Sequence, residues 1–218
     1  MFEKNKKVFY YDRINHCVKN ENDSLLNTAQ KFRYICSIYP YKVLKKVIIP
    51  KFLLLSFMVI STILFFYSVV CFCSFFGLIK TFFFNNQFYQ FMFIPLIIIF
   101  SIFLHELSHA ITGTNLGGII AELGIRRKGL AVTYFTEIIW TTNNPIWRME
   151  YYFSGIAMNM FICGISIQLL FYSKYILFLF TFIINLIFVV LNLLPFRSFK
   201  SDGFNILYLI KCLKIKKE

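Results

Sequence analysis

The sequence predicts an all-α polytopic membrane protein with about four transmembrane helices, a small β-hairpin-like insertion between the second and third, and both termini in the cytoplasm. Three observations predict this fold class. The 218-residue chain is 58% hydrophobic, and its mean hydropathy is +0.66. The segments that flank its apolar runs are alternately rich and poor in Lys and Arg. A soluble domain of this size rarely carries so much apolar sequence.

The first 50 residues are polar and basic. Residues 1–50 are expected to form a basic cytoplasmic segment that is partly helical and lies on the membrane. A loosely ordered basic arm and a small folded domain are the two alternatives for its structure. No cleavable signal peptide is expected, because the first long apolar run begins only after Lys51. Residues 51–218 are therefore predicted to form the transmembrane core.

Four apolar runs in this core are each long enough to cross a bilayer. The predicted spans cover about 52–78, 88–112, 151–172 and 176–194. After the fourth span, residues 203–213 are predicted to form a short amphipathic helix that ends in a basic tail.

The basic residues predict the orientation. Residues 1–51 contain eleven Lys and Arg, and the three segments between spans contain one, four and one, followed by six after the fourth span. The positive-inside rule then places both termini on the cytoplasmic face of the cell membrane. Anionic lipid at that face accounts for the net charge of +13, so lipid is an expected partner and nucleic acid is not.

Residues 119–140 differ from the spans around them. Two stretches rich in β-branched and aromatic residues flank a basic, glycine-containing turn, which predicts a β-hairpin. Such a hairpin would either cap the helices or offer an edge to an extended substrate strand.

The second predicted span contains the motif H-E-x-x-H at His105, Glu106 and His109. Histidines at i and i+4 share one helix face, so their imidazoles can hold one Zn²⁺. Glu106 would act as the general base. Ionisable groups in a membrane span are costly, which favours a functional interpretation.

Zinc in a hydrolytic site needs three protein ligands and a water. Asp202 lies at the membrane boundary after the fourth span, on the side where the second span ends, and is the expected third ligand of one zinc per chain. Gly203 would allow a tight backbone turn beside it.

The chain resembles the site-2 protease family of intramembrane zinc metalloproteases. The resemblance covers about residues 90–212 and rests on three motifs: 103–110 (FLHELSHA), 154–159 (SGIAMN, like the family's G-x-x-x-N), and Asn192-Leu-Leu-Pro followed by Asp202-Gly203. The resemblance implies that His105, His109 and Asp202 bind zinc and that Glu106 is the general base.

The resemblance also implies that Asn159 and Asn192 stabilise the oxyanion or hold the substrate backbone. Interhelical hydrogen bonding is the alternative role for both, and it is the role expected for Asn185. The chain departs from the family in a gap before Asp202 that is about two residues longer, and in Ser201 and Phe204 where Leu and Gly are usual.

These expectations define a zinc metalloendopeptidase that cleaves a membrane-embedded or membrane-associated peptide, or a single-span membrane protein. Compact relatives are associated with small-peptide maturation, so the resemblance also suggests maturation of a small secreted peptide. The alternative is a non-enzymatic membrane scaffold, a peptide-export or immunity partner that retains the fold.

Overall fold

The computed structural model describes residues 2–4, 7–12, 17–20, 33–38, 47–74, 88–128, 131–140, 144–196 and 201–215. Four helices in this part of the chain are long and apolar enough to cross a membrane. These are α2 (Lys51–Ser74), α4 (Ile94–Asn115) with the preceding 3-10 helix η1 (Phe88–Phe93), α5 (Pro145–Ser173) and α6 (Ile176–Leu193). The predicted fold class of a four-span membrane protein is confirmed; the end of the first predicted span, 75–78, lies outside the described residues.

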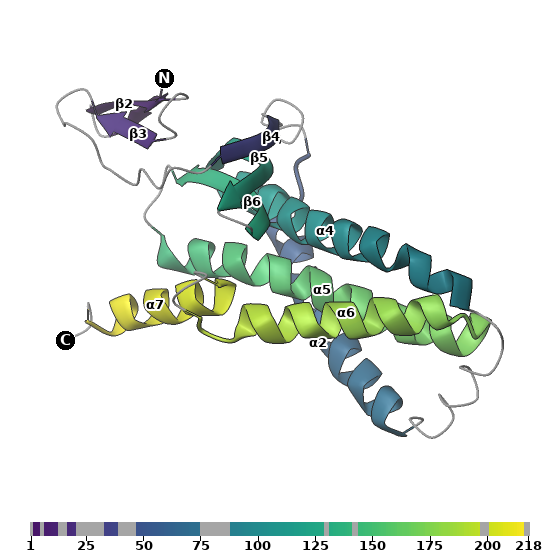
Figure 1. Cartoon of the computed structure of the whole chain (residues 1–218). Coiled ribbons are helices and arrows are strands. Elements are labelled where there is room, and N and C mark those ends of the chain that lie inside the picture. The colour runs from purple at the N-terminus through teal and green to yellow at the C-terminus, as the bar shows by residue number, and fades with distance from the viewer. Residues whose placement is uncertain are drawn as a thin grey trace.

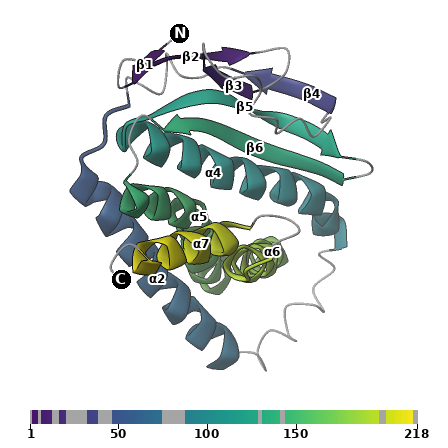
Figure 2. The same cartoon turned by 90° about the vertical axis from the view of Figure 1, so that its left-hand side faces the viewer.

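Helix α5 is the central helix of the bundle. It packs against α2, α4 and α6 (Figures 1 and 2). In its most apolar 18-residue window 61% of residues are buried, against 17–28% in the other three spans. The other spans therefore present most of their apolar side chains outward, as lipid-facing helices do.

The predicted hairpin is present between the second and third spans. Strands β5 (Gly118–Lys128) and β6 (Ala131–Trp140) pair antiparallel, and Gly117 turns the chain into β5 with a positive φ of 83°. The sheet lies over α4 (Figure 2).

Strand β4 (Arg33–Ile38), from the N-terminal segment, adds to this sheet in the order β4-β5-β6. Three further strands of that segment, β1 (Phe2–Lys4), β2 (Lys7–Asp12) and β3 (Cys17–Asn20), form a second antiparallel sheet. The described parts of residues 1–46 are therefore strands, and the helix considered for this segment is not found in them.

Helix α5 begins at Pro145 rather than at Tyr151 as predicted. The backbone N–H of Ile146 donates to Asn144 Oδ1 at 3.0 Å, which caps the helix. Pro145 follows at the first helical position, where its missing N–H costs nothing. Local capping therefore extends the third span by about a turn and a half beyond its apolar run.

The start of α2, the end of α4 and the start of α5 lie together at one end of the bundle. Asn115 Oδ1 accepts a hydrogen bond from Ile49 N at 2.7 Å. Lys51 Nζ lies 3.4 Å from Glu150 and 5.7 Å from the centre of the Trp147 ring. Lys and Trp side chains of this kind mark the membrane–water boundary.

The fourth span leads into α7 (Asp202–Ile215) at this same end. Ser201 Oγ accepts from Phe204 N at 3.3 Å as a helix cap, and donates to the Leu194 carbonyl at 2.6 Å. Gly203 serves close packing rather than the tight turn expected from the sequence. A Cβ there would lie 2.9 Å from Asn192 O and closer still to the Leu193 carbonyl.

Candidate metal centre

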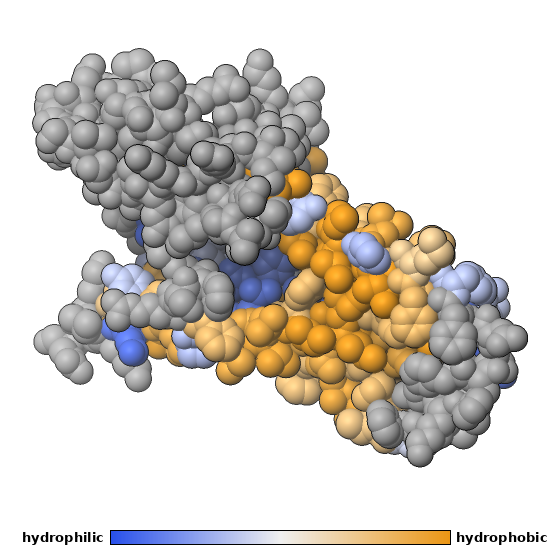
Figure 3. All heavy atoms as spheres, viewed as in Figure 1, coloured by the Kyte–Doolittle hydropathy of each residue, from blue (hydrophilic) through white to orange (hydrophobic). Residues whose placement is uncertain are grey.

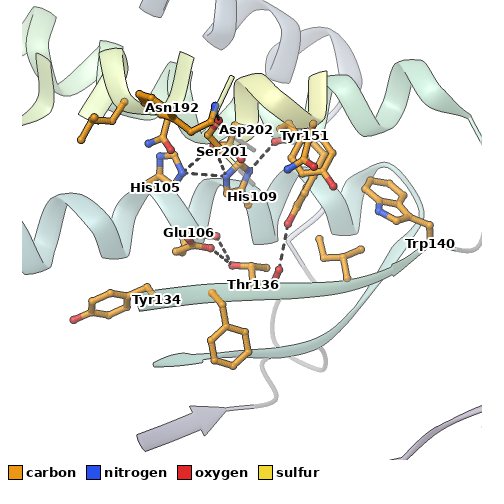
Figure 4. A pocket seen from close by; sticks show the side chains of 16 residues that line it. His105, Glu106, His109, Tyr134, Thr136, Trp140, Tyr151, Asn192, Ser201 and Asp202 are labelled. Atoms are coloured by element: carbon orange, nitrogen blue, oxygen red, sulfur yellow. Dashed lines mark hydrogen bonds and ion pairs between the residues drawn. The ribbon is translucent and has the colours of Figure 1, made fainter. Parts of the chain in front are cut away.

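The three expected ligands meet at one point. His105 Nε2 lies 3.1 Å from His109 Nε2, and Asp202 Oδ2 lies 3.2 Å from the first and 3.3 Å from the second. The histidines come from α4 and the carboxylate from the first turn of α7 (Figure 4). Among the described residues, this is the group of His, Cys, Asp and Glu that could hold a metal ion.

All three side chains are buried; none of these residues is more than 9% exposed. Burial alone would raise the pKa of Asp202, but the imidazoles of His109 and His105 hold it well below its usual range. Apart from its two contacts with these imidazoles, Asp202 Oδ2 has no hydrogen-bond partner in the described part of the chain. A buried carboxylate oxygen that lacks a donor is suited to a cation.

Each imidazole is also held at its other nitrogen. His109 Nδ1 donates to the backbone carbonyl of Tyr151 at 2.8 Å, while His105 Nδ1 lies 3.1 Å from Asn159 Nδ2. Both partners belong to α5. The central helix therefore supports both histidines from behind while their Nε2 atoms face Asp202.

Gly155 lets α5 approach these rings. A Cβ at this position would lie 2.7 Å from His105 Nε2 and closer still to His109 Nε2. Any larger residue would occupy the space between the imidazoles and the α5 backbone. Gly155 therefore shapes the centre itself.

Glu106 turns toward the hairpin (Figure 4). Thr136 Oγ1, on β6, lies 2.8 Å from Glu106 Oε2 and 3.0 Å from the Glu106 carbonyl oxygen. The phenol of Tyr151 donates in turn to the Thr136 carbonyl at 3.3 Å. The expected general base is thus connected to the sheet.

A cavity of about 760 Å³ opens beside the three ligands. Its walls come from α4, β6, the start of α5, the end of α6 and the start of α7, and they include Tyr134, Trp140, Tyr152 and Phe196. In Figure 3 a recessed hydrophilic area lies beside the hydrophobic surface of the bundle. The cavity is large enough to admit a peptide segment as well as water.

The two expected asparagines occupy different places. Asn192 lines the cavity beside Asp202. Asn159 is not among the lining residues; it is 1% exposed and lies behind His105. Asn185 donates to Ser101 Oγ at 3.0 Å, which matches the interhelical role expected for it.

The sequence alone does not indicate that Thr136 and Tyr151 belong to the site. Thr136 is one of several threonines near the hairpin, and only the fold places it against Glu106. Tyr151 supports His109 through its backbone carbonyl, which no side-chain pattern reveals.

Comparisons with known proteins add no family assignment: no protein-family model, no curated protein and no solved structure matches this chain.

Proposed function

We propose that this protein is an intramembrane zinc metalloendopeptidase of the site-2 protease type. The observation that carries the proposal is the convergence of two imidazole nitrogens and one carboxylate oxygen, 3.1–3.3 Å apart, next to a glutamate and a cavity. Its substrate would be a membrane-embedded or membrane-associated peptide, or a single-span membrane protein.

The spacing of the three atoms supports zinc. Ligands about 2.0–2.1 Å from a tetrahedral zinc lie about 3.3–3.4 Å from one another. The observed separations of 3.1, 3.2 and 3.3 Å are close to one face of such a tetrahedron. Two histidines and one carboxylate leave the fourth position free, as in catalytic rather than structural zinc sites.

Zinc held there would supply a Lewis acid that polarises the peptide carbonyl and lowers the pKa of water. Glu106 accepts a proton from the attacking water and delivers it to the leaving amine. The products are a new carboxylate and a new amine, one water having been consumed. Thr136 holds the Glu106 carboxylate during these transfers.

The hairpin supports an extended substrate. Among the described strands, β6 is an edge of its sheet, and its residues Tyr134, Thr136, Ile138 and Trp140 line the cavity. An edge strand offers backbone groups to a peptide that lies beside it. A helical peptide hides its carbonyls in its own hydrogen bonds, so it would unwind before cleavage.

Charge supports an active site toward the cytoplasmic side of the cell membrane. Among the described residues, Lys51 and Arg148 lie at the bundle end that carries the three ligands, whereas Lys174 lies at the opposite end of α5. Anionic lipid and the positive-inside rule both favour the cytoplasm for that end. Maturation of a small secreted peptide fits this placement.

The test compares wild type with Glu106→Gln, which keeps the side-chain shape and loses the base. Both proteins, loaded with zinc in detergent, are incubated with synthetic peptides of transmembrane-segment length, and new termini are detected by mass spectrometry. Wild type is expected to produce fragments and the variant none. Identical fragments from both proteins would contradict the proposal, as would a zinc-loaded wild type that cleaves no peptide.

The non-enzymatic scaffold remains the competing function. It predicts that Glu106→Ala supports any cellular role of the protein as well as wild type does. The complete set of ligands and the Thr136 contact on Glu106 favour the enzyme, since a scaffold needs neither.

A further inference from the structure

The two zinc-facing histidines are supported in chemically different ways. His109 Nδ1 meets a backbone carbonyl at 2.8 Å. A carbonyl can only accept, so Nδ1 carries a proton, and in a neutral ring the Nε2 lone pair is then free for a metal. His105 Nδ1 instead meets a carboxamide, Asn159, which can present either a donor or an acceptor.

The carboxamide presents its donor. Asn159 Nδ2 is 3.1 Å from His105 Nδ1, so in a neutral ring the proton lies on Nε2, which is directed at Asp202 Oδ2, 3.2 Å away. A protonated Nε2 cannot bind a metal. Asn159 Oδ1 is buried and has no hydrogen-bond partner among the described residues.

We infer that Asn159 is a positioning residue that sets the tautomer of His105. Without metal, its N–H donates to Nδ1. With metal, the Asn159 carboxamide rotates by about 180°, and its Oδ1 accepts a hydrogen bond from His105 Nδ1–H. The one N–H proton of the His105 ring then lies on Nδ1, and Nε2 is free to bind the metal. This role differs from contact with the substrate, in keeping with the absence of Asn159 from the cavity lining.

The inference rests on the metal-binding part of the proposed function and not on peptide hydrolysis. A partner at the second nitrogen of a metal-binding histidine usually orients the ring and strengthens the bond. The competing role is a hydrogen bond that merely holds α4 to α5. Asn185 gives a matched case, because it is also fully buried, has an unpartnered Oδ1 in the described structure, and bonds Ser101 of α4, which lies one helical turn before His105 and is not one of the three ligands.

The experiment uses the full chain, purified in detergent and stripped of metal. Zinc affinity is measured by competition with a chromogenic chelator, and the visible absorption of the Co²⁺ form is recorded. Asn159→Leu removes the amide and should weaken zinc about 10–100-fold. Asn159→Asp keeps an acceptor for Nδ1–H and should stay within about 3-fold of wild type, with a wild-type Co²⁺ spectrum.

Asn185→Leu is the control and should leave zinc affinity unchanged, although it also removes a buried amide. Helicity and a single elution peak establish folding, and Asn159→Ala replaces the leucine variant if that fails to fold. The inference is overturned if Asn159→Leu binds zinc as wild type does, or if Asn159→Asp is as weak as the leucine variant. A wild type that binds no zinc would instead overturn the proposed function as well.

Discussion

Thr136 Oγ1 lies 2.8 Å from Glu106 Oε2, which connects strand β6 to the expected general base on α4. The two residues are 30 positions apart and belong to elements that the sequence predicts separately. A hydrogen bond to a carboxylate is among the stronger ones in proteins and fixes its direction. A substrate strand added to β6 would therefore lie beside the residue that holds the base.

We predict that Thr136→Val lowers the rate of peptide cleavage about 10-fold while zinc affinity stays unchanged. The hydroxyl is lost at nearly constant volume, so Glu106 keeps its chemistry but loses its orientation. The loss should be smaller than the ~10²–10⁴-fold effect of removing a general base. The measurement is kcat on a peptide cleaved by wild type, together with zinc content.

Thr136→Ser retains the hydroxyl and should recover most of the rate. Thr181→Val provides a matched control, because among the described residues the Thr181 hydroxyl bonds within α6, to the Leu177 carbonyl at 2.9 Å. A Thr136→Val enzyme with wild-type kcat would show that the contact with Glu106 does not serve catalysis.

Gly155→Ala should weaken zinc binding by about 100-fold or more, at the upper end of effects on metal-site geometry. The added methyl would displace the imidazoles, since it lies 2.7 Å from His105 Nε2. Gly164→Ala is the control on the same helix. Its methyl would press on Leu64 Cβ at 2.8 Å, so it should lower stability and leave zinc affinity intact. Equal zinc affinity in the two variants would refute this account of Gly155.

Ser201→Ala should lower the melting temperature of the zinc-loaded protein by about 2–4 °C. The variant loses the cap of α7, typically worth about 1 kcal/mol, and the bond to the Leu194 carbonyl. Ser201→Thr keeps the hydroxyl and should melt close to wild type. The melting temperature is followed by circular dichroism, and an unchanged value for the alanine variant would mean that Ser201 does not anchor the helix that carries Asp202.

The elements that were predictable from sequence are those with a strong local pattern. Long apolar runs indicate the spans, the turn after β5 indicates the hairpin, and His105 and His109 are one helical turn apart whatever the tertiary structure. Hydropathy predicts a later start for α5 than the structure has, because the capping signal Asn144-Pro145 lies before the apolar run.

Other features depend on contacts between distant segments. The pairing of β4 with β5 joins residues 33–38 to residues 123–127, and no local pattern specifies that partner. The hydrogen bond from His109 to the Tyr151 backbone carbonyl cannot be predicted from the sequence, because every residue has a backbone carbonyl. Asp202 was predictable from sequence as a carboxylate at the same membrane depth as the two histidines. The role of Ser201, where the site-2 protease motif usually has Leu, depends on the packing of α7 against the end of α6 and could not be predicted.

The central claim is that His105, His109 and Asp202 form one zinc site. Zinc per chain, measured by mass spectrometry on detergent-purified wild type and Asp202→Ala, tests it most directly. The account predicts about one zinc in wild type, and little or none in the variant after mild chelation, because removing one of three ligands opens the site. A folded wild type without zinc, or a variant that retains zinc as tightly as wild type, would contradict it.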